Sequence, residues 1–341
     1  MARRMIRRFI MFAALVCVLS AAGAYGIFLL PYYYHDPGGK VVTIPRGASF
    51  RSAVDSLASS HVIRSWWTFQ LAGRLMGYTK TIKTGKYLFV SGQSNYDILK
   101  DIRDGKSRLV IQVTIPEGWR MEQMARRYMH EIGIDSEKFI ALCHDSLFLH
   151  DHGIESKSLE GYLMPETYAF YWQTDEREIL MRMLDGFKLF YNDSLFERQR
   201  EMKATQQEIL TLASIVEAES SIGDERPVIA GVYWNRIKKR MRLEADPTVQ
   251  YALGEGKKLN HRDLDFNSPY NTYRHYGLPP GPINNPGKSS ILAALFPQQN
   301  EYLYFVATGV GGHHFSKNFN DHQKNINKYH RTRRELLRVS K

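Results

Sequence analysis

The stretch Thr211-Leu-Ala-Ser-Ile-Val-Glu-Ala-Glu-Ser-Ser-Ile-Gly223 decides the fold of the C-terminal part of this chain. Its periodicity predicts a helix that carries Glu217 and Glu219 and stops at Gly223, with successive residues about 100° apart around the axis. The apolar side chains then share one broad arc: Ile209, Leu212, Ile215, Val216 and Ile222. Glu219 falls inside this arc, and Glu217 falls near its edge.

A carboxyl group on the core-facing side of a helix is a candidate general acid. Burial disfavours the ionised form, so the pKa of Glu219 should rise toward neutral pH, where a general acid works best. The simpler alternative is that Glu219, near the helix end, points into solvent or caps a neighbouring turn. The spacing alone leaves both alternatives open.

The N-terminal segment predicts a membrane anchor. Residues 9–30 form a run of 22 residues without a charge, preceded by four arginines and followed by Pro31. This length spans a bilayer, and the positive flank favours a cytoplasmic N-terminus. The alternative is a signal peptide cleaved near Ala22-Gly23-Ala24, but the apolar run continues past that point. Leu15-Val16-Cys17 is also a poor lipoprotein box.

We therefore expect a cytoplasmic basic tail over residues 1–8 and an uncleaved single-pass anchor over residues 9–30. Everything after Tyr32 should lie outside the cytoplasm. The net charge of +11 favours anionic partners, although four of these charges belong to the leader and no nucleic-acid motif is present. With only Cys17 and Cys143, the fold must depend on its core instead of disulfides.

A weak internal repeat organises the chain that follows. Val42-Thr-Ile-Pro-Arg-Gly47 recurs as Val113-Thr-Ile-Pro-Glu-Gly118, and each copy is a short strand followed by a turn and a helical pattern. These patterns favour an α+β fold with a small α/β module over residues 40–106 and a mixed α+β domain over residues 108–341. The first module should contain helices over 49–59 and 95–104 and a strand over 85–90.

The larger domain should combine helices with ordered loops. We expect helices over residues 120–132, 136–148, 179–200 and 322–338, and a helix after Gly223 with Asp224 as its N-cap. The aromatic segment 159–168 could line a sugar subsite, but such residues more often build the core. Residues 243–251, 267–273 and 277–283 are expected to be functional loops. Residues 301–307 and 314–316 should form a hairpin.

Several kinds of chemistry have little support in the sequence. The histidines at 313, 314, 322 and 330 lack the spacing of a zinc site, so we expect no metal and no cofactor. Cys143 has no activating context, and no Gly-x-Ser-x-Gly elbow is present. Gly309-Val-Gly-Gly312 lacks the lysine and helix of a phosphate loop. Acid–base catalysis by a carboxylate remains, and an ordinary glycosidase would need a second carboxylate, for which Asp224, Glu225, Glu244 and Asp246 are available.

The chain resembles the endolytic murein transglycosylases, the MltG or YceG-like family. Six motifs in the family order carry the resemblance: Ala213-Ser-Ile-Val-Glu-Ala-Glu219, Asp246-Pro-Thr-Val249, Tyr270-Asn-Thr-Tyr273, Gly277-Leu-Pro-Pro-Gly281, Leu303-Tyr-Phe-Val-Ala307 and Gly311-Gly-His313. The resemblance implies a single-pass inner-membrane protein with a LysM-like module before the catalytic domain. It also implies non-hydrolytic cleavage between N-acetylmuramic acid and N-acetylglucosamine, which leaves 1,6-anhydromuramoyl ends on peptidoglycan strands.

The resemblance also implies roles for individual residues. Glu219 aligns with the family's catalytic glutamate, and Glu219-Ser220 matches a Glu-Ser pair of other lytic transglycosylases. Asp246, Asn271 and Tyr273 are candidates for holding the sugar, and Ser220 for orienting the glutamate or the N-acetyl group. Asn271 and Tyr273 could instead only build their loop. The alternative function is a noncatalytic membrane anchor that binds glycan and recruits cell-wall synthases.

Overall fold

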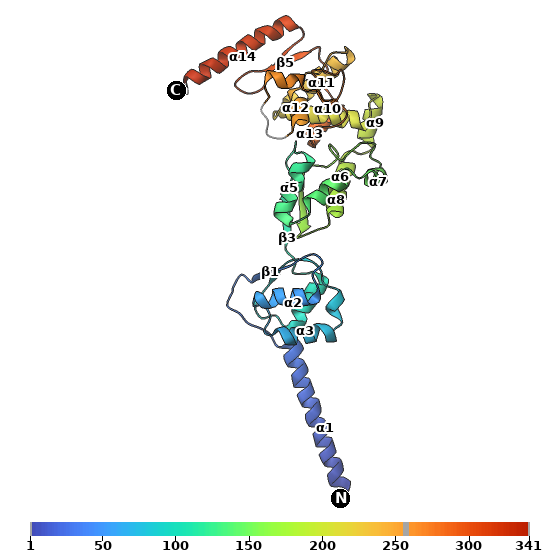
Figure 1. Ribbon diagram of the computed structural model, residues 1–341, viewed down its shortest axis with the longest axis vertical. Coiled ribbons are helices and arrows are strands. Elements are labelled where there is room, and N and C mark those ends of the chain that lie inside the picture. Colours follow the sequence, from blue (N-terminus) through green and yellow to red (C-terminus); the bar gives the residue numbers. More distant parts are fainter. Residues whose placement is uncertain (1, 255–258, 340–341) are drawn as a thin grey trace. The chain divides into compact units, whose positions relative to one another are not determined.

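The computed structural model describes residues 2–254 and 259–339, which form two compact units (Figure 1). The first unit comprises residues 1–112, 131–134 and 169–174, and the second comprises residues 113–130, 135–168 and 175–341. The described residues are mostly helical, with three two-stranded sheets, which is a mixed α+β fold.

The first unit begins with an apolar helix. α1 (Ala2–Ala24) continues into the π-helical turn η1 (Tyr25–Leu29). Together the span 3–29 is long and apolar enough to cross a membrane, and its most hydrophobic part is not buried within the protein. This helix is compatible with a single-pass membrane anchor.

The remainder of the first unit is a small α/β module. β1 (Lys40–Ile44) pairs antiparallel with β2 (Gly85–Phe89), with Val42 opposite Tyr87. Side chains alternate along both strands, so that one face of the sheet is buried. Helices cover this face, and each begins at a serine whose hydroxyl accepts a backbone N–H: α2 (Phe50–Ser59), α3 (Trp66–Leu75) and α4 (Asn95–Asp104). A short 3-10 turn, η2 (Tyr78–Lys80), follows α3.

The second unit is built mainly from short helices, and the chain contains two further small sheets, of which β5–β6 lies wholly in this unit. β3 (Val110–Thr114) pairs with β4 (Thr167–Tyr171), and β5 (Tyr304–Ala307) pairs antiparallel with β6 (His313–Ser316). In the aromatic segment 159–168, Tyr162, Leu163 and Met164 are buried, which places them in the core. The helices are α5 (Met121–Ile132), α6 (Ser136–Cys143), α7 (Ser146–Asp151), α8 (Glu176–Phe190), α9 (Asp193–Glu201), α10 (Gln206–Glu219), α11 (Arg226–Lys238), α12 (Asp246–Leu253), α13 (Lys288–Leu295) and α14 (Phe319–Val339), with 3-10 turns η3 (Gly223–Glu225) and η4 (His261–Asp265).

Two predicted helices are wrong because a capping residue divides each of them. Residues 136–148 form α6 and α7, since Asp145 accepts the N–H groups of Leu147 and Phe148 and begins a new helix. Residues 179–200 form α8 and α9, and Asn192 caps α9 in the same way. A side chain that caps its own backbone outcompetes the continuation of the helix.

Two further predictions after Gly223 need correction. Asp224 does not cap α11: it lies in η3, and α11 begins after Glu225, which makes no side-chain cap. The segment 243–251 is only partly a loop, because α12 begins at Asp246. Pro247 is tolerated there, since the first turn of a helix needs no donor from it.

Candidate active site

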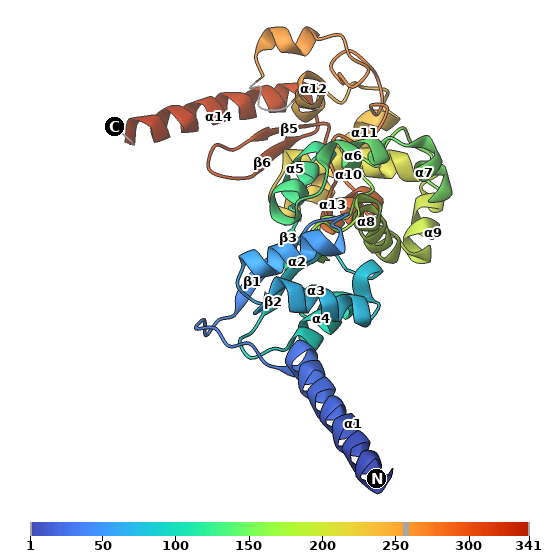
Figure 2. The same ribbon diagram turned by 60° about the horizontal axis from the view of Figure 1, so that its bottom comes forward.

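α10 is the central helix of the second unit. A capping box fixes its start: Thr205 Oγ1 accepts the N–H of Glu208, and the Glu208 carboxylate accepts the N–H of Thr205. Residues 209–216 are all buried, and the helix packs against α11, α12 and α13 (Figure 2). Ser214 Oγ accepts the N–H of Ile283, and this hydrogen bond attaches the loop before α13 to α10. α10 is therefore rigidly held up to its last turn.

Glu219 is the last residue of α10, and it lies partly buried at the wall of a pocket. Tyr233, a fully buried residue of α11, donates its hydroxyl to Glu219 Oε1 at 2.7 Å. Burial raises the pKa of Glu219 to about 7. The Tyr233 hydrogen bond opposes the rise, and the nearby Asp246 carboxylate adds to it. Glu219 thus has the protonation behaviour of a general acid and base near neutral pH.

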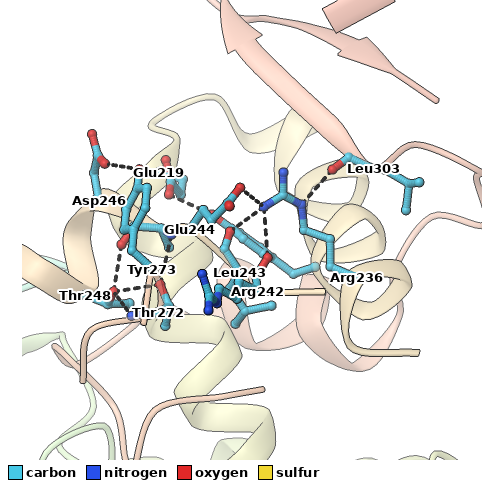
Figure 3. A network of polar contacts seen from close by, with 12 residues as sticks. Glu219, Arg236, Arg242, Leu243, Glu244, Asp246, Thr248, Thr272, Tyr273 and Leu303 are labelled. Atoms are coloured by element: carbon cyan, nitrogen blue, oxygen red, sulfur yellow. Dashed lines mark hydrogen bonds and ion pairs between the residues drawn. The ribbon is translucent and has the colours of Figure 1, made fainter. Parts of the chain in front are cut away.

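The pocket has a volume of about 260 Å³. Its walls come from α10, α11, the start of α12, β5 and α14, and its lining residues are Glu219, Tyr233, Arg236, Leu243, Glu244, Asp246, Tyr273, Phe305 and His322. Tyr273 donates its hydroxyl to Asp246 Oδ1 at 2.6 Å, and both lie beside Glu219 (Figure 3). Glu219, Asp246 and Tyr273 therefore share one concave site with a third carboxylate, that of Glu244.

Arg236 holds one wall of the pocket in place. Its guanidinium donates to the carbonyls of Leu243 and Leu303 and to Glu244 Oε2 at 3.1 Å (Figure 3). Glu244 has a φ of 51°, which is an unfavourable conformation for a residue with a side chain. The N–H of Glu244 donates to the Thr272 carbonyl. These contacts hold the turn at Glu244, which places Asp246 at the pocket.

Glu217 lies two residues before Glu219, but its carboxylate contacts a different set of residues. Its side chain is 7% exposed and forms a salt bridge of 2.9 Å with Arg226. Its other oxygen accepts the N–H of Gly287 at 2.9 Å. Arg226 also donates to the Ser220 carbonyl and to Ser289. Glu217 is thus a structural partner of a buried arginine and does not line the pocket.

The structure brings Glu219, Asp246 and Tyr273 together but places the other two predicted site residues behind the pocket. Ser220 is buried, accepts the N–H of Ile222 and contacts Glu225 at 3.5 Å. Asn271 is fully buried: its amide donates to the carbonyls of Leu264 and Phe266, and its oxygen accepts the N–H of Tyr273. This geometry assigns Ser220 and Asn271 to the support of the surrounding loops.

Of the residues that line the pocket, Tyr233, Arg236, Leu243, Phe305 and His322 were not predicted as site residues, and Glu244 was named only as a possible second carboxylate. Tyr233 and Arg236 are three residues apart on α11, so their shared face was a usable signal once that helix was known. His322 belongs to the histidine group considered for a metal, and burial lowers its pKa. His313, in contrast, contacts Glu225 through Nδ1 at 2.7 Å. Within residues 2–254 and 259–339, no group of three or more potential ligands is placed to hold a metal.

Comparisons with known proteins agree on one family. The model of the YceG-like family matches residues 42–328. A protein of Bacillus subtilis named endolytic murein transglycosylase is 32% identical over 92% of this chain and 91% of its own length. A Streptococcus pneumoniae protein of the same name is 28% identical, and the match covers 93% of this chain but only 64% of that longer protein. The crystal structure of a putative YceG-like protein from Listeria monocytogenes matches with a TM-score of 0.60 at 32% identity, over 85% of this chain and 99% of that one.

Proposed function

The chain belongs to the YceG-like family, and from this premise we propose that it is a membrane-anchored lytic transglycosylase of peptidoglycan. Its proposed reaction cleaves the glycosidic bond between N-acetylmuramic acid and N-acetylglucosamine within a glycan strand and leaves a 1,6-anhydromuramoyl end. Such cleavage would terminate or trim nascent strands. The observation that carries the proposal is the position of Glu219, partly buried in a pocket and with a pKa raised to about 7.

Glu219 takes two roles in the proposed mechanism. Its proton passes to the glycosidic oxygen as the bond to the muramoyl C1 breaks, and the glucosamine end leaves as an alcohol. The C6 hydroxyl of the same muramoyl residue then bonds to C1 and gives its proton to the Glu219 carboxylate. The proton count balances, and the attacking oxygen comes from the substrate. A pKa near neutrality suits a group that must both give and take a proton in one cycle.

The remaining pocket residues have supporting roles in this proposal. The Asp246 carboxylate, held by the Tyr273 hydroxyl, faces the same space as Glu219 and would stabilise positive charge that develops at C1. Tyr273 offers an aromatic face for a sugar ring. Ser220 and Asn271 would act indirectly, since their hydrogen bonds hold the loops that follow Glu219 and precede Tyr273.

The architecture supports a proposed location for the reaction. The arginines at the start of α1 favour a cytoplasmic N-terminus, so the chain after Tyr32 would lie on the extracytoplasmic side of the inner membrane. We also propose residues 40–106 as a LysM-like glycan-binding module, because two helices connect its antiparallel strands β1 and β2. The second unit would then hold the catalytic domain, proposed over residues 108–341.

A hydrolytic mechanism is the second candidate, because Asp246 and Glu244 place further carboxylates in the pocket. A hydrolase would use one of these carboxylates as nucleophile or to activate water. The test incubates the full-length, detergent-solubilised protein with purified glycan strands and analyses the products by mass spectrometry. Anhydro ends support the transglycosylase, and reducing ends support the hydrolase. If neither the wild type nor Glu219→Gln yields products, the protein is instead a glycan-binding anchor that recruits cell-wall synthases.

A further inference from the structure

The first unit carries an exposed apolar stripe on one face of α3. Trp67, Leu71 and Leu75 follow one another at intervals of four residues and are 76%, 45% and 65% exposed. The opposite face of the same helix, which includes Phe69 and Ala72, is buried in the core of the module. A helical spacing of four places the three side chains along one line. Contiguous exposed apolar groups of this kind mark an interaction surface.

Contacts within the first unit place this stripe beside the end of the apolar N-terminal helix. α3 packs against η1, the last turn of that helix. Arg64 Nη2 donates to the carbonyl of Pro31 at 3.3 Å, and its guanidinium lies 5.9 Å from the centre of the Tyr32 ring. Trp67 is three residues after Arg64, and an extended chain spans at most about 3.5 Å per residue. The Cα of Trp67 is therefore within roughly 10 Å of the Cα of Arg64.

The length of the apolar N-terminal helix determines where the module lies relative to the bilayer. A bilayer core needs about 20 apolar residues, and counted from Phe9 this length ends at Phe28. However, Ile27 and Phe28 pack against the hydrophobic core of the module. Asn95 Nδ2 also donates to the carbonyl of Ile27 at 2.7 Å. The module thus covers the helix at the depth where hydrocarbon meets the lipid headgroups, with no free tether between them.

We propose that the α3 stripe of Trp67, Leu71 and Leu75 rests in the headgroup region of the bilayer that the chain's own helix crosses. Tryptophan favours this interface, and the exposed Arg64 and Arg74 would meet anionic lipid phosphates. This inference rests on the proposed membrane anchoring but not on the chemistry at Glu219. This contact between the α3 stripe and the bilayer would fix the distance of the module from the membrane and leave the other faces of the module to bind glycan.

The test measures fluorescence quenching from within the membrane. The full chain is reconstituted into vesicles of phosphatidylethanolamine with a minority of phosphatidylglycerol, with or without lipid that carries a nitroxide near its glycerol backbone. The chain has five tryptophans, so the difference between wild type and Trp67→Phe isolates Trp67. Trp67→Phe should retain the fold, because this side chain is 76% exposed. Trp234→Phe is the control, since the Trp234 indole donates to the Ala294 carbonyl in the second unit.

We expect the nitroxide lipid to remove most of the Trp67 emission. Wild type and Trp234→Phe should then lose a clearly larger fraction of their fluorescence than Trp67→Phe, and Trp67 should be shielded from acrylamide in the water. Equal quenching of wild type and Trp67→Phe, in protein that still floats with the vesicles after an alkaline wash, would overturn the inference and leave the anchor intact. Protein that the wash removes would overturn the proposed anchor and this inference together.

Discussion

Glu217 and Glu219 lie two residues apart at the end of α10, yet their carboxylates have opposite surroundings. Glu217 is paired with the guanidinium of Arg226 and with the N–H of Gly287. Glu219 receives one neutral hydroxyl, from Tyr233, and faces the Asp246 carboxylate across the pocket. In the part of the chain that the structure describes, no lysine or arginine forms a salt bridge with Glu219.

The difference between the two sites shows that burial alone does not make a carboxyl group a general acid. Both side chains are withdrawn from water, but a bound arginine stabilises the charge of Glu217, whereas Glu219 has no such partner. Burial therefore raises the pKa of Glu219 to about 7. One helical turn thus supplies a structural carboxylate on one side and a proton-transfer group on the other.

The largest expected effect is the loss of cleavage in Glu219→Gln. The amide cannot supply or accept the proton, so the rate should fall about 10³-fold, within the usual range for a general acid–base group. The measurement is the rate of product formation from purified glycan strands by mass spectrometry. The fold should persist, because Tyr233 can still donate to the amide oxygen. A Glu219→Gln protein that cleaves at the wild-type rate would assign the chemistry to another residue.

Glu217→Gln should show the reverse pattern. It leaves the Arg226 charge buried, and among the residues that the structure describes only the more distant Glu117, at 3.6 Å, remains as an anionic partner. Breaking a buried ion pair in this way costs about 3 kcal/mol of the free energy of unfolding, with little direct effect on the chemistry of the folded fraction. Chemical denaturation and the rate at low temperature measure the two quantities. Inactivity with undiminished stability would exchange the roles of the two glutamates.

The sequence predicted this pair only in part. The apolar arc of α10 correctly separates Glu219 from Glu217, because a helical period depends on local residues alone. The groups that contact each carboxylate come from elsewhere: Tyr233 and Arg226 belong to α11, and Gly287 lies 70 residues away from Glu217. Only the tertiary fold brings these groups together.

The loops also show that contacts made by the tertiary fold cannot be predicted from local sequence. The local patterns predicted the helices 49–59 and 95–104 and the strand 85–90 of the first module, but they did not predict α3. In contrast, Asn271 reads as a polar loop residue that could bind a sugar, and its amide is instead satisfied by the carbonyls of Leu264 and Phe266. Polar residues that bind substrate and those that satisfy a loop's own backbone are indistinguishable in sequence.

The dependence of stability on pH tests the environment of Glu219 without any substrate. The carboxyl has a pKa of about 7 in the folded state and near 4.5 when unfolded, so between these values only the folded state retains the proton. The free energy of unfolding of the wild type should therefore fall as pH rises through this window, by up to about 3 kcal/mol from this group. Glu219→Gln lacks this contribution, and other groups, such as the buried Glu160, titrate equally in both proteins.

The relevant measurement is denaturant unfolding of wild type and Glu219→Gln at several pH values. We expect Glu219→Gln to gain stability relative to the wild type as pH rises from about 4.5 to about 7, and the gain to level off above. A constant difference over this range would show that the pKa of Glu219 is not raised in the folded protein.

Tyr233→Phe should move the pH dependence of activity upward. In the wild type, kcat/KM should decline as pH rises through about 7, because the free enzyme loses the catalytic proton of Glu219. The Tyr233 hydroxyl stabilises the ionised carboxylate, so its removal raises the pKa of Glu219 further and shifts this decline to higher pH. The rate should also fall roughly tenfold, the equivalent of one lost hydrogen bond to a charged group. If the decline of kcat/KM stayed at the same pH in Tyr233→Phe, a group other than Glu219 would be responsible for it.

Asp246→Asn should move the same decline in the opposite direction, and by less. The Asp246 charge contributes to the raised pKa of Glu219, but burial contributes more, so the amide lowers this pKa modestly and the decline begins at lower pH. The paired measurement is the pH profile of kcat/KM for the two variants under identical conditions. Shifts of opposite sign are expected only if Tyr233 and Asp246 both act on the proton of Glu219, because a general loosening of the pocket would move both profiles the same way. Glu217→Gln, whose carboxylate lies outside the pocket, should leave the position of the decline unchanged.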